Sequence, residues 1–313
     1  MAHYCNEIAE YWQLHVDAIP IILINIAATT CEQSYVFRAN QFKKPLNLYN
    51  CVVAKSSYGK SPMLGLVQTS ILAVRNSRTM KFREVGDKLN GTSHIGVIFN
   101  EGTTAGLLDA LKGCTKLLLT EEGDVILRRM GTFLSPTITG RDSSLLDDCR
   151  AQLINLYDHP EQYSKKLKNS IVEAGLTGEL VQRAIIRRAQ NTLADALFER
   201  FLFWVLSGDT IDTKINPPEW DSSRWPTIDK FAIIMSFFER VEMHFNEDAN
   251  IRAMEERDDH LASRYGKSVD AVHRLAGLFQ IIELSSDMLT IFVERYEGFE
   301  DQSASNDFVV KCE

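Results

Sequence analysis

The sequence has no paired cysteines, no long apolar run and no excess of positive charge. Its six cysteines are scattered and form no C-x-x-C pair, which argues against a disulfide framework or a zinc site and favours reduced intracellular thiols. The seven histidines show no spacing typical of metal ligands. A net charge of −8 argues against whole-molecule attraction to nucleic acid, although local basic patches are compatible with it.

Sequence signals for a membrane protein are also missing. The most apolar early stretch, Ala18 to Ala28, is too short to span a bilayer and predicts a buried helix. The N-terminus has no signal-peptide pattern, so we expect a soluble intracellular protein, cytoplasmic or nuclear, with no membrane partner. With 313 residues and 45% hydrophobic content, the chain is long enough for one large domain or two smaller ones.

The most informative segment runs from Ala54 to Ser61 and reads Ala-Lys-Ser-Ser-Tyr-Gly-Lys-Ser. It follows an apolar run at residues 48–53 and precedes an apolar helix pattern at residues 61–74. A strand, a Gly-Lys-Ser turn and a helix in this order are typical of a phosphate-binding P-loop, here with alanine in place of the first glycine. The pattern predicts a nucleotide-binding site, and an ordinary surface turn is the alternative.

Each residue type in this segment has a chemical reason. Successive backbone N–H groups form a concave anion site, and Gly59 permits close approach of the backbone. Lys60 is expected to contact the β- and γ-phosphates, and the Ser61 hydroxyl is expected to bind Mg²⁺. Pro62 lacks an N–H donor, but proline is tolerated in the first turn of a helix. The predicted nucleotide-binding residues are Ala54, Lys55, Ser56, Ser57, Tyr58, Gly59, Lys60, Ser61 and Pro62.

Two carboxylates, Glu121 and Glu122, follow a predicted strand at residues 115–120. Acidic residues at the C-terminal end of a buried strand lie where α/β sheets bind their ligands. We expect Glu121 to bind Mg²⁺ together with Ser61, and Glu122 to position or deprotonate the attacking water. The alternative is that both are solvated residues near a helix start, where negative charge is favourable.

The predicted elements change in character along the chain. Strands at residues 48–53, 94–99 and 115–120 alternate with helices at 61–74 and 103–111, which favours an α/β fold with a mainly parallel sheet. Helices are also predicted within residues 1–30, 145–156, 179–206 and 227–295. The segment 209–226 carries Pro217-Pro218 and Trp225-Pro226 and predicts a loop, and residues 301–313 predict a poorly ordered tail.

Together these segments resemble a poorly characterised family of P-loop proteins from bacteria, phages and mobile elements, often encoded beside or fused to primases. The similar segments are Pro45–Tyr49, Ser57–Pro62, Thr103 and Thr104 with Leu107 and Leu108, Glu121–Gly123, Leu153–Asp158, Glu199–Phe203 and His273–Gly277. The chain departs from the family pattern at Ala54, at Glu121 and at His159-Pro160, where the family tends to carry a glycine.

The resemblance implies a RecA-like P-loop ATPase domain at residues 31–206, after an N-terminal helical segment at 1–30 and before a helical C-terminal region at 207–300. It also implies ATP and Mg²⁺ as cofactors. By the same analogy Arg200 is the arginine expected to contact the γ-phosphate, followed by Arg150 and Arg274. The implied partners are DNA, further copies of this chain in a homo-oligomer, and a primase or other replication protein.

The expected function is therefore that of an ATPase, a helicase- or translocase-like motor acting on nucleic acid, with Lys60, Glu122 and Arg200 as catalytic residues. The alternative is an ATP-binding switch or assembly protein with slow or absent hydrolysis and a protein partner, since the motifs are substituted and the net charge is acidic. A small-molecule kinase ranks lowest, because the sequence shows no lid-like arginine cluster and no acceptor-site signature.

Overall fold

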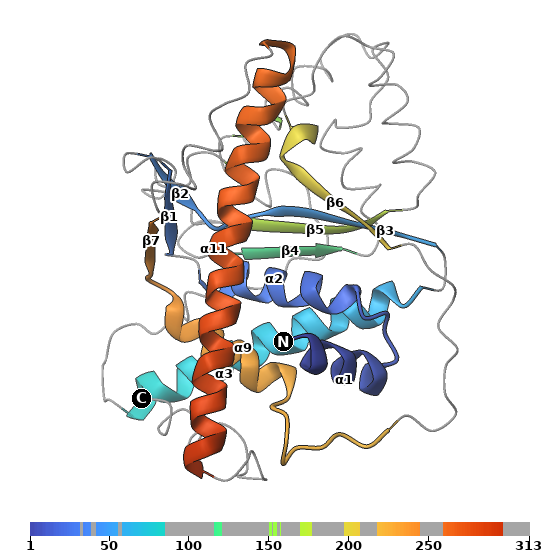
Figure 1. The fold of residues 1–313 in the computed structure, drawn as a ribbon, viewed down its shortest axis with the longest axis vertical. Coiled ribbons are helices and arrows are strands. Elements are labelled where there is room, and N and C mark those ends of the chain that lie inside the picture. The colour runs from blue at the N-terminus through green and yellow to red at the C-terminus, as the bar shows by residue number, and fades with distance from the viewer. Residues whose placement is uncertain are drawn as a thin grey trace.

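A four-stranded parallel sheet lies at the centre of the computed structural model of this chain (Figure 1). The structure describes residues 1–31, 34–38, 42–55, 58–84, 116–120, 150–151, 153–154, 157, 170–176, 197–206, 218–244 and 259–296. The strands of this sheet are β3 (Tyr49–Ala54), β4 (Lys116–Thr120), β5 (Ser170–Leu176) and β6 (Phe201–Leu206). Their order is β4-β5-β3-β6, and each pairing is parallel. All six residues of β3 are buried, as is typical of an internal parallel strand.

Two of these strands agree with the sequence prediction. β3 and β4 lie within one residue of the predicted ranges 48–53 and 115–120. The helix predicted at 179–206 is wrong at β6, because its Phe-Leu-Phe-Trp-Val-Leu run consists largely of aromatic and branched residues that suit a pleated sheet. The prediction contains no strand at β5, while the strand predicted at 94–99 and the helix predicted at 103–111 lie outside the described residues. The RecA-like assignment stays a prediction.

Four of the described helices lie on one side of this sheet in the view of Figure 1, and they are α1 (Ala2–Trp12), α2 (Ala18–Thr30), α3 (Lys60–Glu84) and α9 (Ile228–Met235). The long helix α11 (Asp259–Tyr296) runs across the level of the sheet and extends beyond it on both sides. Helix α2 contacts β5 on one side and α3, α9 and α11 on others. All of its thirteen residues except Pro20 are buried, which explains why this helix is apolar all round. The predicted N-terminal helices are thus confirmed, and α2 is a central core element.

A second, smaller sheet contains β1 (Tyr35–Arg38), β2 (Phe42–Pro45) and β7 (Glu242–His244). Strand β1 pairs with β2 antiparallel and with β7 parallel. The helix predicted over 227–295 is wrong at β7, where side-chain exposure alternates along the strand and the ring of His244 stacks on Phe37 at 4.5 Å. A short 3₁₀ turn at Phe198–Arg200 leads into β6, and another at Ser236–Phe238 follows α9.

The hydrophobic core does not follow the predicted division into segments at residues 30 and 206. One cluster of buried residues includes members from α1, α2, β3, α3, α9 and α11. The Ser70 hydroxyl of α3 also donates a hydrogen bond to the Asp229 carboxylate of α9 at 3.0 Å. The described helices of the N- and C-terminal regions share this core with β3, so the packing of each element stabilises the others.

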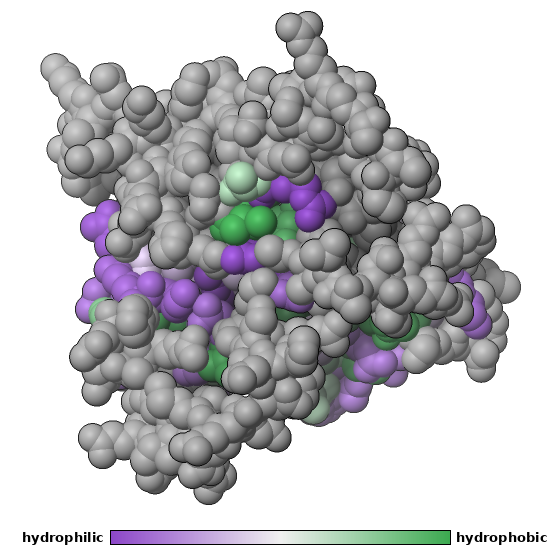
Figure 2. All heavy atoms as spheres, turned by 90° about the horizontal axis from the view of Figure 1, so that it is seen from above, coloured by the Kyte–Doolittle hydropathy of each residue, from purple (hydrophilic) through white to green (hydrophobic). Residues whose placement is uncertain are grey.

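None of the helices in the described part of the chain combines the length and the apolar character needed to cross a bilayer. On the face seen from above, apolar described residues are visible in small areas beside hydrophilic ones (Figure 2). Among the large apolar residues that the structure describes, Val205 on β6 and Val272 on α11 are the most exposed, at 66% and 60%.

Candidate nucleotide-binding site

The predicted P-loop connects the central strand of the parallel sheet to a long helix. Ala54 is the last residue of β3, and Lys60 is the first residue of α3. Strand β3 lies between β5 and β6, so the loop leaves the sheet at the C-terminal ends of its inner strands. Ser56 and Ser57, two of the predicted nucleotide-binding residues, lie outside the described residues. The strand-loop-helix context that the motif requires is therefore confirmed.

Gly59 adopts the backbone conformation for which the motif needs glycine. Its φ of +81° lies in the left-handed region, where a side chain is strained. A Cβ atom at this position would also lie 3.3 Å from Cδ2 of Leu14. The Gly59 carbonyl accepts a hydrogen bond from the Met63 N–H at 3.2 Å and so begins the first turn of α3. Gly59 therefore shapes both the loop and the helix start.

The Lys60 side chain turns back across the loop. Its ammonium nitrogen donates a hydrogen bond to the Ala54 carbonyl oxygen at 3.3 Å, so the first and seventh residues of the loop are in contact. A neutral carbonyl is a weaker partner for an ammonium group than a phosphate oxygen, because the phosphate adds the attraction of an opposite charge. The ammonium is thus held near the loop by a contact that an anion would replace favourably.

Ser61 and Pro62 lie in the first turn of α3, and both residues are exposed. Ser61 therefore lies at the positive end of the helix dipole. Pro62 falls among the first four helix positions, whose N–H groups have no intrahelical acceptor, so its missing donor costs the helix nothing. Lys55 is also exposed, at the opposite end of the loop.

The predicted acidic residues Glu121 and Glu122 lie outside the described residues, but the strand that precedes them is placed. Thr120, the last residue of β4, pairs with Ala174 of β5, which in turn pairs with Cys51 of β3. The C-terminal ends of β4 and β3 therefore face the same edge of the sheet. Two strand spacings separate β4 from β3, or about 10 Å.

Arg200 lies at the opposite edge of the sheet. It precedes Phe201, which pairs with Tyr49 at the start of β3, whereas Leu206 pairs with Ala54 beside the loop. The length of the strand, roughly 15 to 20 Å, separates Arg200 from the P-loop. The expected role of Arg200 at the γ-phosphate of the same chain does not fit this placement. Its side chain is buried, with the guanidinium carbon 5.9 Å from the centre of the Tyr157 ring.

The other two arginines considered from the sequence lie on the same distant side. Arg150 is one helical turn before Leu153, whose carbonyl accepts a hydrogen bond from the Tyr49 hydroxyl at 2.8 Å. Arg274 of α11 is fully buried and donates hydrogen bonds of 2.8 Å to the carbonyl oxygens of Asn47 and Tyr157. The structure therefore places Lys60, Ser61 and the C-terminal end of β4 at the same edge of the sheet, and Arg200 and Arg274 at the opposite edge.

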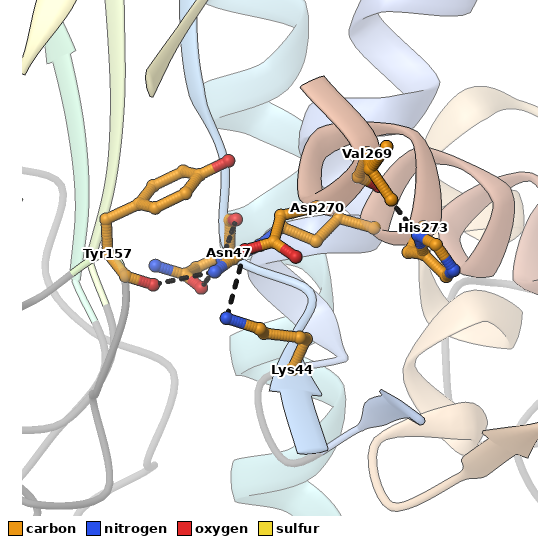
Figure 3. Close-up of polar contacts among 7 residues, drawn as sticks. Lys44, Asn47, Tyr157, Val269, Asp270 and His273 are labelled. Carbon is orange, nitrogen blue, oxygen red and sulfur yellow. Dashed lines mark hydrogen bonds and ion pairs between the residues drawn. The ribbon is translucent and has the colours of Figure 1, made fainter. Parts of the chain in front are cut away.

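Arg274 belongs to a polar cluster at this distant edge, whose other members include Lys44, Asn47, Tyr157 and Asp270 (Figure 3). The Arg274 guanidinium lies 3.9 Å from the centre of the Tyr157 ring and also bonds the Asn47 side-chain oxygen. One turn before it, Asp270 forms an ion pair with Lys44 at 3.0 Å, and both side chains are less than one fifth exposed. The cluster joins α11 to residues 44–47, which lead into β3. Asn47, Tyr157 and Arg274, which belong to segments similar to the P-loop family, therefore have a structural role here.

Two groups of contacts, one made by the strand β3 that leads into the loop and one made by the loop itself, have no signature in the sequence. The Asn50 side-chain amide of β3 donates a hydrogen bond to the Asn25 side-chain oxygen of α2, and its own side-chain oxygen accepts one from Trp204 Nε1 of β6 at 3.1 Å. These two bonds link β3 to α2 and to β6. The ring of Tyr58, inside the loop, lies 5.6 Å from the ring of His15. The hydrogen-bonded residues are 25 and 154 positions apart, so local patterns do not reveal them.

Comparisons of this chain with protein-family models, curated proteins and solved structures gave no match. The function is accordingly inferred from the residues and their arrangement.

Proposed function

We propose that this chain is an ATP-binding P-loop ATPase whose triphosphate site is the loop from Ala54 to Pro62. The observation that carries the proposal is the position of Gly59 and Lys60. A left-handed glycine and a lysine that points back over the loop stand at the end of a buried central strand and at the start of a helix. This combination provides backbone donors, a cation and a helix dipole for one anion.

The order of the strands supports the same location. The chain passes from β3 across β5 to reach β4, and from β5 across β3 to reach β6. The strand that follows β3 in the described chain therefore lies toward one edge of the sheet, and the strand β6 that follows β5 lies toward the other edge. In open parallel sheets such a boundary is where ligands bind, outside the carboxyl ends of the strands. The loop after β3 lies at this boundary.

The residues fit a nucleotide with a divalent cation. Lys60 would exchange its bond to the Ala54 carbonyl for the β- and γ-phosphate oxygens, and the Ser61 hydroxyl would bind Mg²⁺ together with Glu121. Bound Mg²⁺ neutralises phosphate charge as it develops. We propose that Glu122, two residues after the end of β4, orients the attacking water and accepts its proton.

Arg200 has no part in this chain's own site under the proposal, since β6 separates it from the loop. The motor activity on DNA, the homo-oligomer and the primase-like partner stay proposals that depend on the family resemblance. The second candidate is an ATP-binding switch with slow or no turnover. It is favoured by Ala54 at the first glycine position and by the contact between Lys60 and Ala54, which holds the lysine in place without nucleotide.

The test is ATP·Mg²⁺ binding and hydrolysis by the full chain, with and without single- or double-stranded DNA at low salt. Lys60→Ala is expected to weaken ATP binding at least about tenfold, because a charge-assisted contact is lost. The matched control is Lys43→Ala, which removes an ammonium group from the small sheet, where Lys43 pairs with Glu242 at 3.5 Å. Equal ATP affinity in the wild type and the Lys60 variant would contradict the proposal.

The same assay separates the two candidate functions. For a motor, ATP hydrolysis rises when DNA is added, and Glu122→Gln retains ATP binding but loses turnover. For a switch, the wild type binds ATP·Mg²⁺ yet hydrolyses it no faster than Glu122→Gln does. DNA that neither binds nor changes the rate at low salt removes the motor, since nucleic-acid binding is strongest there.

A further inference from the structure

The turn between the first two helices is tightly defined. Gln13 ends α1 with a left-handed φ of 53°, and the Leu14 N–H donates a hydrogen bond to the Ala9 carbonyl at 2.8 Å. The His15 carbonyl then accepts a hydrogen bond from the Ala18 N–H at 2.9 Å, where α2 begins. These bonds fix the direction of residues 13–17, and the next helix is buried in the core. The turn therefore presents its side chains in a set arrangement.

Two side chains of this turn contact the second half of the P-loop. The buried Leu14 side chain approaches Gly59 so closely that a Cβ atom there would meet its Cδ2 at 3.3 Å. The His15 ring lies 5.6 Å from the Tyr58 ring, with an angle of 34° between the planes. The Asp17 backbone N–H donates a hydrogen bond to His15 Nδ1 at 3.3 Å, and the Asp17 carboxylate lies 3.3 Å from the same ring nitrogen.

Tyr58 is the loop residue through which the turn acts. Its side chain is only 2% exposed, and its hydroxyl has no hydrogen-bond partner among the described residues. Burial first, and the charge of Asp17 second, raise the pKa of this hydroxyl, so Tyr58 stays neutral at physiological pH. The ring, and not the hydroxyl, therefore accounts for the contacts of Tyr58, and it anchors the residue directly before Gly59 and Lys60.

We infer that the turn at residues 13–17 is a wall of the nucleotide site and that His15, through the ring of Tyr58, is a positioning residue for the phosphate loop. The inference depends on the proposed function, because the ligand is the triphosphate. The turn holds Tyr58, the loop keeps Gly59 in its left-handed conformation, and Lys60 stays directed over the loop.

The experiment compares two histidine variants of the full chain by ATP·Mg²⁺ affinity and by steady-state hydrolysis. His15→Ala removes the ring that contacts Tyr58. His3→Ala is the matched control, because His3 has an aromatic neighbour, Trp225, at 5.3 Å and an acidic partner, Glu7, at 3.5 Å, and these contacts lie away from the loop. We expect His15→Ala to raise the Kd and KM about threefold to tenfold, which is about 0.7 to 1.4 kcal/mol, with kcat unchanged. His3→Ala is expected to leave all three values unchanged.

Two substitutions of Tyr58 separate positioning from general stability. Tyr58→Phe keeps the ring and is expected to bind ATP as the wild type does. Tyr58→Ala removes the ring and is expected to bind more weakly than His15→Ala, and combining it with His15→Ala should add little further loss, because the two residues act in one contact. Affinities are measured below the unfolding temperature of every variant, so loss of fold does not imitate loss of binding.

The outcomes separate this inference from the proposed function. If the wild type binds ATP, Lys60→Ala does not, and His15→Ala equals His3→Ala, the inference is overturned and the ATPase proposal stands. The inference is likewise overturned if Tyr58→Phe binds as weakly as Tyr58→Ala, since the ring would then have no special role. If the wild type itself fails to bind ATP·Mg²⁺, both are overturned.

Discussion

The guanidinium carbon of Arg274 lies 3.9 Å from the centre of the Tyr157 ring, while the guanidinium nitrogens donate hydrogen bonds to the carbonyl oxygens of Asn47 and Tyr157. Arg274 is completely buried, and among the described residues no carboxylate bonds it. Its Nε has no hydrogen-bond partner within the same part of the chain. Neutral carbonyls and an aromatic face thus take the place of a counter-ion, so the arrangement depends on the planar shape of the arginine.

Removing this side chain is expected to destabilise the protein strongly. Arg274→Ala removes three hydrogen bonds to buried acceptor oxygens and creates a cavity, so we expect a loss of about 3 to 5 kcal/mol in unfolding free energy. Arg274→Lys is expected to rescue only part of this, because an ammonium lacks the fork and the flat face. The measurement is urea denaturation, with the exposed Arg224→Ala, expected within about 0.5 kcal/mol of wild type, as control.

Two glycines of the same region are expected to respond to alanine in opposite directions. Gly59→Ala places a side chain at a φ of +81° and against Leu14, so we expect a loss of about 1 to 2 kcal/mol in stability and weaker ATP binding. Gly65→Ala adds a Cβ inside α3 with no described atom within 4 Å, so a gain of about 0.5 to 1 kcal/mol is expected. Thermal unfolding of the two variants checks both signs, and a stable Gly59→Ala variant would contradict the loop conformation.

Asp229 gives a prediction for pH dependence. Burial raises the pKa of its carboxyl, and the hydrogen bond from Ser70 opposes this only in part. Because the folded state holds this proton to higher pH than the unfolded state, the stability contribution of Asp229 is full below its ordinary pKa, about 3.9, and is lost as the pH rises through the folded pKa. Asp229→Asn, which keeps the acceptor for Ser70, is therefore expected to be stabilising by less than about 1 kcal/mol at pH 7, since the helix dipole favours the charge.

The gain in unfolding free energy from Asp229→Asn is expected to disappear toward acid pH. Urea denaturation of the variant and the wild type between pH 3 and pH 7 measures this difference. Asp221→Asn is the control of opposite sign. Hydrogen bonds from Ser223 lower the pKa of the exposed Asp221 carboxyl, so its contribution is present above the ordinary pKa and is lost as the pH falls through the folded pKa. An Asp229→Asn effect that stays constant with pH would show that charge is not its cause.

Local sequence patterns predicted the elements whose signals are local. The run before the P-loop is a strand, the residues after it are a helix, and Lys116–Thr120 is a strand, as the apolar runs and the glycine indicated. β6 was missed because an apolar run of this length reads equally as helix or strand until a partner is known. The family resemblance placed Arg200 at the γ-phosphate, whereas a strand that starts at Phe201 puts it at the edge away from the loop.

The sequence by itself determined the phosphate-loop motif, because its strand, glycine, lysine and helix are encoded within about one element of one another. Only the tertiary structure decided which distant residues meet that loop. His15 reaches Tyr58 and Asn25 reaches Asn50 through the burial of α2, while Arg274 binds near the start of β3 and not at its end. Such contacts arise when whole elements pack to bury apolar surface, and no spacing along the chain specifies them.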